Sequence, residues 1–311
     1  MGSKRVGLAR TQALLENLKR DLNLANSNIL NGILRRKAGF TGTAASTQED
    51  TTLVIGRNAI GQDGTVVNPF AEAASAQFPL GTILKYNDRT YRYCRNGGSG
   101  LAAGKVTCTR NKSHASNHLN MQISAGGGVG TYKVTVETAG STNIVENEYA
   151  GGYLYVNDGV GEGHCYKIKS HPAHVHDTDP SCEITLYDPI VVGLTTAGGT
   201  RSEVSLSHSK YEKVIVAPGS TPMTGQTVGV PPVAVTAAYY FWNQVSGPAA
   251  VLVTGTVVIG DSVCASISGG TAGAVQARVA DSAAQRVARS VGEVMQVNAS
   301  TEYALIDLTM E

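Results

Sequence analysis

The sequence is poor in charge. Asp, Glu, Lys and Arg make up 16% of its 311 residues, against about a quarter in ordinary soluble domains. The formal net charge is +1, so no global field attracts the chain to nucleic acid or to an anionic membrane. We therefore expect neither as a partner. A mostly neutral surface suits a protein that other subunits largely cover.

Cysteine is sparse and shows no paired pattern. Five cysteines are spread along the chain without a C-x-x-C pair, which argues against the disulfide framework of a secreted protein. Cys94 and Cys108 bracket a segment of hairpin size, so they either stay buried free thiols or form a late disulfide after lysis. Synthesis in a reducing compartment, the cytoplasm, fits this pattern.

Long apolar runs and catalytic motifs are also missing. No run approaches the roughly 20 residues of a membrane-spanning helix, and the N-terminus lacks the continuous apolar core of a secretory signal. The glycine-rich stretches SAGGGVG and NGGSGLAAGK make neither a P-loop nor a dinucleotide-binding fingerprint. Ser246 lacks the glycines of a nucleophile elbow. We expect neither an enzyme nor a bound cofactor.

The first 37 residues form a basic segment with a leucine stripe. Leucines recur at spacings of seven, three and four, which predicts an amphipathic helix. Such a helix either docks on another subunit, contacts nucleic-acid phosphates, or packs on its own chain. We favour docking and expect these residues at a partner interface: Leu8, Arg10, Leu15, Leu18, Lys19, Arg20 and Leu22.

From about residue 53 the apolar residues alternate with a period of two, which indicates strands. TILKYNDRTYRYCR alternates on both sides of Asn87-Asp88, a dipeptide that suits a hairpin turn. Short strands bounded by turn residues follow to the C-terminus. The predicted fold is all-β, with two small antiparallel β-sandwich or barrel domains behind an N-terminal helical arm.

A proline cluster suggests where these domains divide. Pro218, Pro222, Pro231 and Pro232 fall close together, and proline is confined to strand edges, strand starts and connections. The expected parts are an arm over 1–37, a linker and extended segment over 38–75, a β domain over 76–217 and a small C-terminal β-barrel over 218–311.

Histidines concentrate in HPAHVHDTDPSCE, residues 171–183, which holds three of the seven. His174 and His176, with His171, Asp177 and Cys182 near them, are ligand types that zinc accepts. Structural zinc sites usually have two pairs of closely spaced ligands separated by a longer spacer, and this stretch lacks that pattern. Its prolines indicate a turn-rich connection between two expected strands. We predict a solvated or inter-subunit loop, with His174 and His176 as the candidates for a metal site.

Four consecutive aromatic residues, YYFW at 239–242, alternate across an expected strand. Two of them are predicted to lie in the core. Aromatic rings often anchor interfaces, so Tyr240 and Trp242 are the candidates for a subunit contact.

Several stretches resemble structural proteins of tailed bacteriophages of the marine type. They are FPLGTILKYNDRTYRYCRNGGSGLAAGKV, YAGGYLYVNDGVGEGHCYKIKSHPA, ITLYDPI and VGVPPVAVTAAYYFWNQVSGPAAVLVTGTVVIGDSV. The last block, 230–310, is similar to the small β-domains of head decoration, or cement, proteins. The shared pattern runs through Tyr240, Trp242, Gln244, Gly247, Gly260, Asp261, Gly292 and Leu308.

The resemblance implies a capsid decoration protein. Such a protein is made in the host cytoplasm and resides in the virion, where it binds the major capsid protein and itself, commonly as a homotrimer. Two alternatives stay open. The chain either forms the shell as the major capsid protein, although it lacks the expected long spine helix, or is a carbohydrate-binding tail or fibre module, which requires an aromatic platform.

Overall fold

The computed structural model describes residues 54–311 except 57–58, 62–63, 111–117, 139–142, 176–177, 180, 199, 220–222, 224, 268–269 and 279–287. The described fold belongs to the second of the chain's two compact units, Ala44–Glu311. The predicted helical arm, with Leu8, Arg10, Leu15, Leu18, Lys19, Arg20 and Leu22, lies outside the described residues.

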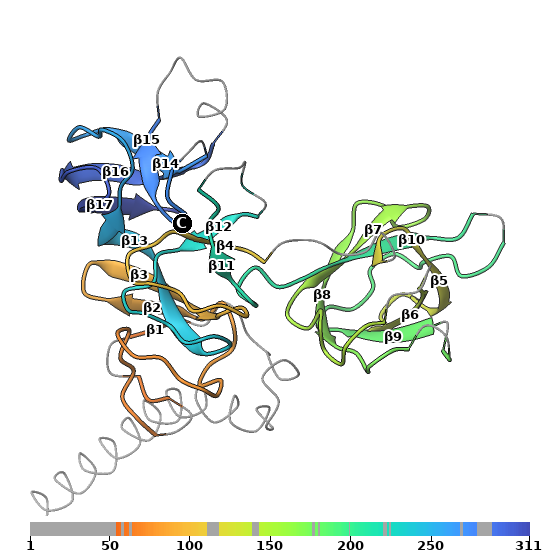
Figure 1. The fold of residues 1–311 in the computed structure, drawn as a ribbon. Helices are drawn as coiled ribbons and strands as arrows, with labels where there is room; N and C mark the ends of the chain where they lie inside the picture. The colour runs from red at the N-terminus through yellow and green to blue at the C-terminus, as the bar shows by residue number, and fades with distance from the viewer. Residues whose placement is uncertain are drawn as a thin grey trace, which may run out of the picture. The chain divides into compact units, whose positions relative to one another are not determined.

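Every regular element among the described residues is a β-strand, which confirms the all-β prediction, and most pairings are antiparallel. No helix in the described part of the chain is long and apolar enough to cross a membrane. The strands form an eight-stranded sheet, a three-stranded sheet and a closed six-stranded barrel (Figure 1).

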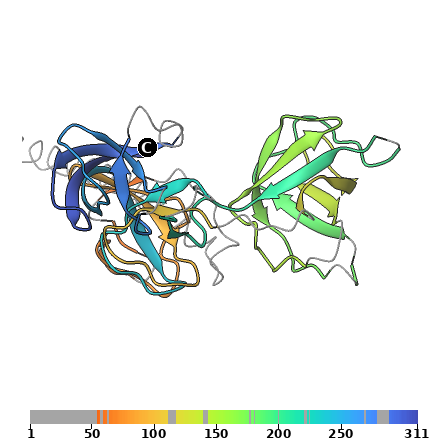
Figure 2. The same ribbon diagram turned by 45° about the horizontal axis from the view of Figure 1, so that its top comes forward.

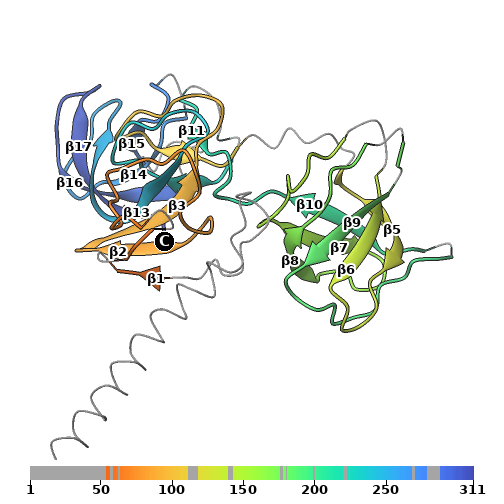
Figure 3. The same cartoon turned by 90° about the horizontal axis from the view of Figure 1, so that it is seen from below.

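The eight-stranded sheet has the order β1-β2-β3-β13-β17-β16-β14-β15. Its strands are β1 (Val54–Ile55), β2 (Ile83–Tyr86), β3 (Arg89–Arg95), β13 (Tyr240–Leu252), β14 (Ser262–Ala265), β15 (Val275–Ala277), β16 (Ser290–Gln296) and β17 (Tyr303–Thr309). The views agree that β2, β3 and β13 lie side by side (Figure 3). The three-stranded sheet consists of β11 (Ile215–Val216), β4 (Thr107–Cys108) and β12 (Thr227–Gly229). We call these two sheets and their loops the body.

The predicted hairpin at Asn87-Asp88 is confirmed. Strands β2 and β3 pair antiparallel up to Tyr86 and Arg89, which leaves a two-residue turn. Asn87 adopts φ 55°, a left-handed conformation that Asn tolerates better than most residues.

The strand β13 joins parts of the sequence that the proline cluster had separated. Its first half pairs with β3 and its second half with β17. Strands from the predicted domains 76–217 and 218–311 therefore share one sheet, and strand pairing does not break at residue 218. The reason is the length of β13, whose 13 residues are enough to pair with two different strands. The positions of the prolines do not predict such a shared strand.

The barrel is inserted between β4 and β11 and has the closed order β10-β5-β6-β9-β8-β7 (Figure 2). Its strands are β5 (Met121–Gly126), β6 (Lys133–Glu137), β7 (Tyr153–Asp158), β8 (Cys165–Ser170), β9 (Ser181–Leu186) and β10 (Glu203–Ser207). Alternate apolar residues fill the interior, as the period of two predicts; among them are Ile123, Val134, Leu154, Ile168 and Ile184, all 0% exposed.

Candidate functional site

The barrel has two different ends. Because consecutive strands run antiparallel, the β5–β6, β7–β8 and β9–β10 connections share one end. The chain enters before β5 and leaves after β10 at the opposite end, the connector end. Neither connection to the rest of the chain lies at the first end.

The first end is rimmed by exposed valines. Val129, Val160 and Val191 are 69%, 49% and 58% exposed. Their three loops converge on Leu194, whose backbone N–H donates to the Gly127 carbonyl oxygen at 2.9 Å. A Cβ on Gly161 would lie 2.6 Å from the Leu194 side chain, so this loop also packs closely there. We call this set the apolar barrel end.

The sequence carries a signal for this surface that periodicity does not detect. Val129 and Val160 stand beside glycine in GGGVG and DGVGEG, and Val191 lies two residues before Gly193 in the turn-rich stretch PIVVG. An apolar side chain in such a turn has no strand face on which to be buried. Exposed apolar patches of this kind mark interaction surfaces more often than isolated exposed residues do.

The connector end gathers histidines around one buried tyrosine, Tyr149. His118 Nδ1 hydrogen-bonds to the Tyr149 hydroxyl, and the His208 ring lies 4.2 Å from the Tyr149 ring between centroids. The Tyr149 backbone N–H donates to His171 Nε2 at 3.0 Å. Burial raises the pKa of Tyr149 above its ordinary value, so its hydroxyl stays protonated at neutral pH.

The prediction of a solvated loop at His171 and His174 is wrong, because both side chains are buried, at 3% and 2% exposed. His171 Nδ1 lies 2.9 Å from the Pro172 carbonyl oxygen. Since its Nε2 accepts a hydrogen bond, the proton resides on Nδ1 and the ring is neutral. Burial lowers the pKa of His171. His174 Nε2 lies 2.7 Å from Thr138 Oγ1.

These two histidines have a structural role. They are buried because the chain after β8 pairs back on the β6–β7 connection, through an isolated bridge between Ile144 and His174. In the described part of the chain, no group of three His, Cys, Asp or Glu side chains is arranged to hold a metal ion. The candidate His176 and its neighbour Asp177 lie outside that part.

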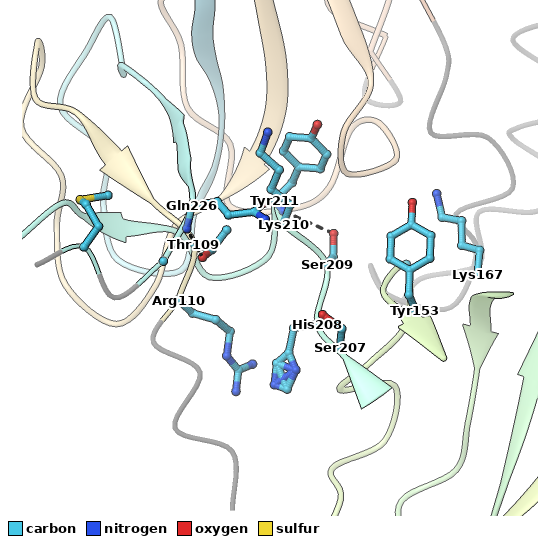
Figure 4. A pocket seen from close by; sticks show the side chains of 13 residues that line it. Thr109, Arg110, Tyr153, Lys167, Ser207, His208, Ser209, Lys210, Tyr211 and Gln226 are labelled. Atoms are coloured by element: carbon cyan, nitrogen blue, oxygen red, sulfur yellow. Dashed lines mark hydrogen bonds between the residues drawn. The ribbon is translucent and has the colours of Figure 1, made fainter. Parts of the chain in front are cut away.

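A cleft of about 620 Å³ lies beside the connector end. Polar and cationic side chains line it, as Figure 4 shows, among them Arg110, Tyr153, Lys167, His208, Lys210 and Tyr211. Arg110 and His208 both contact the Glu148 carboxylate, at 3.2 and 3.5 Å. Part of the positive charge in the cleft is thus neutralised from within the chain.

A second carboxylate, that of Glu311, contacts Lys210 and Tyr211, which line the same cleft. Its Oε1 lies 3.2 Å from Lys210 Nζ and accepts the Tyr211 hydroxyl at 3.1 Å. Its Oε2 accepts Arg92 Nε at 2.5 Å. Burial opposes ionisation of Glu311, but the cations Arg92 and Lys210 outweigh it and hold its pKa below the ordinary value. The cleft is therefore braced by ion pairs on this side.

Two tyrosines that the sequence argument did not single out stand on the outer face of the barrel. Tyr153 and Tyr155 on β7 are 45% and 38% exposed, and their spacing of two places both on one face. Lys167 on β8 is the register partner of Tyr153. The signal was the alternation in GYLYVND, where the tyrosines take the outward positions and Leu154 and Val156 the inward ones.

The prediction of exposed aromatic anchors at Tyr240 and Trp242 is not met in the described chain, because they are 4% and 3% exposed. Trp242 packs on Tyr93 with ring centroids 4.8 Å apart and on Phe78 at 5.5 Å. The segment that contains Phe78 covers β13, and Ala73 bridges to Tyr240. Sequence alternation alone predicts that one face of β13 is exposed. The covering segment buries both faces at Tyr240 and Trp242.

All five cysteines are free thiols, and Cys94 and Cys108 lie in separate core clusters. Burial raises the pKa of Cys108 to about 11 and that of Cys182 to about 11. Both side chains are therefore protonated thiols at neutral pH, as expected for cysteines that serve as apolar packing.

No family model matches the chain, and no curated protein and no solved structure matches it either.

Proposed function

We propose that the protein is a capsid decoration protein that binds the outer surface of a tailed-phage head and bridges neighbouring subunits. The observation that carries the proposal is the apolar barrel end, a ring of three exposed valines on loops that converge on Leu194. The resemblance of the sequence to head decoration proteins supports it. The partners are the major capsid protein and other copies of this chain, in a symmetric, commonly trimeric, assembly in the virion.

The physical reason is avidity. A fully buried valine contributes about 1.5 kcal/mol or more, so three together provide only a modest gain after the cost of association is subtracted. A symmetric assembly repeats the contact, and linked contacts bind far more tightly than each one alone. Low charge lowers the desolvation cost of covering the surrounding surface.

The direct test places carboxylates on the apolar barrel end. The double substitution Val129→Asp and Val191→Asp is expected to weaken co-sedimentation with capsids that lack this protein more than about tenfold, because two buried valines are lost and two charges are desolvated. Val145→Asp, at a position 69% exposed on the connector end, is the matched control and should bind normally. Equal binding by both variants would show that the apolar barrel end does not contact the capsid.

Copy number separates the decoration role from its alternatives. Mass analysis of purified virions should find hundreds of copies in a ratio set by capsid geometry. A few copies to a few dozen would exclude both decoration and the major capsid role. One copy per shell position, with no other shell protein, would identify the major capsid protein instead.

The exposed pair Tyr153 and Tyr155 favours a second candidate, a carbohydrate-binding module. Outward tyrosine rings with a neighbouring lysine, Lys167, provide stacking surface and a hydrogen-bond donor for sugar hydroxyls. Binding to a host-glycan array that is lost in Tyr153→Ala and Tyr155→Ala, but kept in Tyr132→Ala, would support it. Tyr132 is a suitable control because it is 50% exposed and lies in the β5–β6 connection, away from β7.

A further inference from the structure

The large sheet of the body leaves apolar side chains uncovered on its outer face. Along β17, Tyr303, Leu305 and Asp307 take outward positions, and the residues between them are buried. Tyr303 and Leu305 are 43% and 39% exposed, although the outward positions of a solvated sheet face are usually polar. Both line a groove of about 390 Å³ together with Phe70, which is 43% exposed. Such a face indicates a surface that another molecule covers.

This face carries both signs of charge, on opposite sides of β13. Asp307 on β17 and Glu293 on β16 are direct register partners, and both are exposed. On the other side, Arg89 on β3 is the one charged residue among the described residues that line the groove. Its guanidinium lies 5.7 Å from the centre of the Phe70 ring. The nearest printed carboxylate is that of Asp88, 3.9 Å away and exposed, a pair that contributes little in water.

The two acids have no cation of their own. Like charges directly opposite each other destabilise an antiparallel pair. Within the described part of the chain, no ion pair joins Glu293 or Asp307 to a Lys, Arg or His side chain. A cation from outside the chain would therefore relieve the repulsion between them.

The cation and the acids stand at one level along the strands. Gly247 on β13 approaches Arg89 closely, since a Cβ at Gly247 would lie 3.1 Å from the Arg89 Cγ. The next residue, Pro248, is the register partner of Asp307. The strand order β3-β13-β17-β16 (Figure 1) separates β17 and β16 from β3 by about 10 and 14 Å at the usual strand spacing.

We propose that two copies of this chain pair through this face, about a two-fold axis parallel to β13. Rotation about such an axis turns one sheet over onto the other. It exchanges the two sides of β13 and keeps every residue at its level along the strands. Arg89 of each copy then lies over Asp307 and Glu293 of the other. A surface that is complementary to itself is what an isologous two-fold contact requires.

The same rotation covers the apolar side chains. It brings Tyr303 and Leu305 of each copy toward Phe70 of the other, in the aligned manner in which two sheets pack face to face. Removal of these side chains from water favours association, and the charge pairs fix the register. An unrelated partner would have to carry both signs of charge at the same spacing, whereas a second copy already does.

This inference concerns the purified chain and does not rest on the proposed capsid role. Capsid binding is assigned to the apolar barrel end and the two-fold contact to the body. The variant with Val129→Asp and Val191→Asp should therefore still dimerise. Loss of capsid binding and loss of the dimer are separate outcomes, so either proposal can fail without the other.

Sedimentation velocity of the full-length chain tests the proposal. We expect a reversible dimer whose dissociation constant rises about 25-fold in Arg89→Glu, because an exposed ion pair contributes up to about fivefold and the symmetry repeats it. The matched control is Lys85→Glu, which should leave the dimer unchanged. Lys85 is exposed and is the register partner of Thr90, so it lies on the opposite face from Arg89. A chain that stays monomeric, self-associates without a dimer, or forms a dimer that Arg89→Glu leaves intact would overturn the proposal.

Mixing two charge variants separates this contact from nonspecific association and from damage to the fold. Glu293→Lys with Asp307→Lys should weaken the dimer as Arg89→Glu does. In an equimolar mixture of these two variants, a heterodimer has one native set of charge pairs and one reversed set, so dimerisation should return to the wild-type level. Two variants that remain monomeric when mixed would contradict the assigned contacts.

Discussion

The cover over Trp242 can be tested by removing one ring, because Trp242 is the single tryptophan of the sequence and reports its own environment. Phe78 is half-buried and contacts two rings, Trp242 at 5.5 Å and Tyr93 at 5.6 Å between centroids. We expect Phe78→Ala to expose the indole to water and to destabilise the body.

The magnitude follows from these contacts. Each aromatic pair contributes about 0.5–1.5 kcal/mol beyond the area that it buries, so two pairs contribute about 1–3 kcal/mol. Loss of the buried part of the ring adds about 1 kcal/mol. The free energy of unfolding should therefore fall by about 2–4 kcal/mol, in line with other aromatic truncations.

The assay combines denaturant unfolding followed by tryptophan emission with acrylamide quenching of the native protein. In Phe78→Ala the native emission should shift to the red and quenching should increase, with a lower unfolding midpoint. Phe70→Ala is the matched control. Phe70 contacts Tyr86 at 6.4 Å and is 43% exposed, so its loss should cost under about 1 kcal/mol and leave the emission unchanged. Unchanged quenching in Phe78→Ala would refute the assignment of this ring as the cover.

Three further outcomes are expected in the barrel. Because burial lowers the pKa of His171, the unfolded state takes up its proton first. Barrel stability should therefore be constant above about pH 6.5 and fall as the pH drops below it; thermal unfolding of His171→Gln should show a flatter dependence. The hydrogen bond from Arg201 lowers the pKa of Glu137, so its contribution should be present at neutral pH and be lost as the pH falls below about 4.5. Glu137→Gln should cost under about 1 kcal/mol at pH 7, since this pair is partly exposed, and no measurable loss of stability in acid titration would contradict the pairing. Gly152→Ala should cost about 3 kcal/mol or more in urea unfolding, because the added Cβ would lie 2.0 Å from the Ser207 carbonyl oxygen; a near-neutral result would show that the two segments do not approach so closely.

Local patterns predicted local features well. The period of two identified the strands, and Asn87-Asp88 identified a hairpin turn whose first residue has the positive φ that the dipeptide permits. The inward and outward positions of β7 also follow from alternation. These features depend on a few consecutive residues, so no distant contact was needed to predict them.

The candidate surfaces were predicted less well. The histidines appeared polar and therefore solvated, yet His171 and His174 are buried, because both ring nitrogens of His171 and Nε2 of His174 have backbone or hydroxyl partners. The valines of the apolar barrel end appeared to be ordinary apolar residues. Only the convergence of three loops on Leu194 shows that they gather at one exposed place.

The sequence by itself determined the all-β class, the hairpin and the low, nearly balanced charge, because each depends on composition or on neighbours along the chain. Tertiary structure alone decided that β13 joins β3 to β17, that Trp242 is covered, and that Glu293 faces Asp307 across two strands. Each of these is a pairing between distant segments. Such a pairing is selected by the packing of whole sheets, and the period of one strand does not specify which other strand lies beside it.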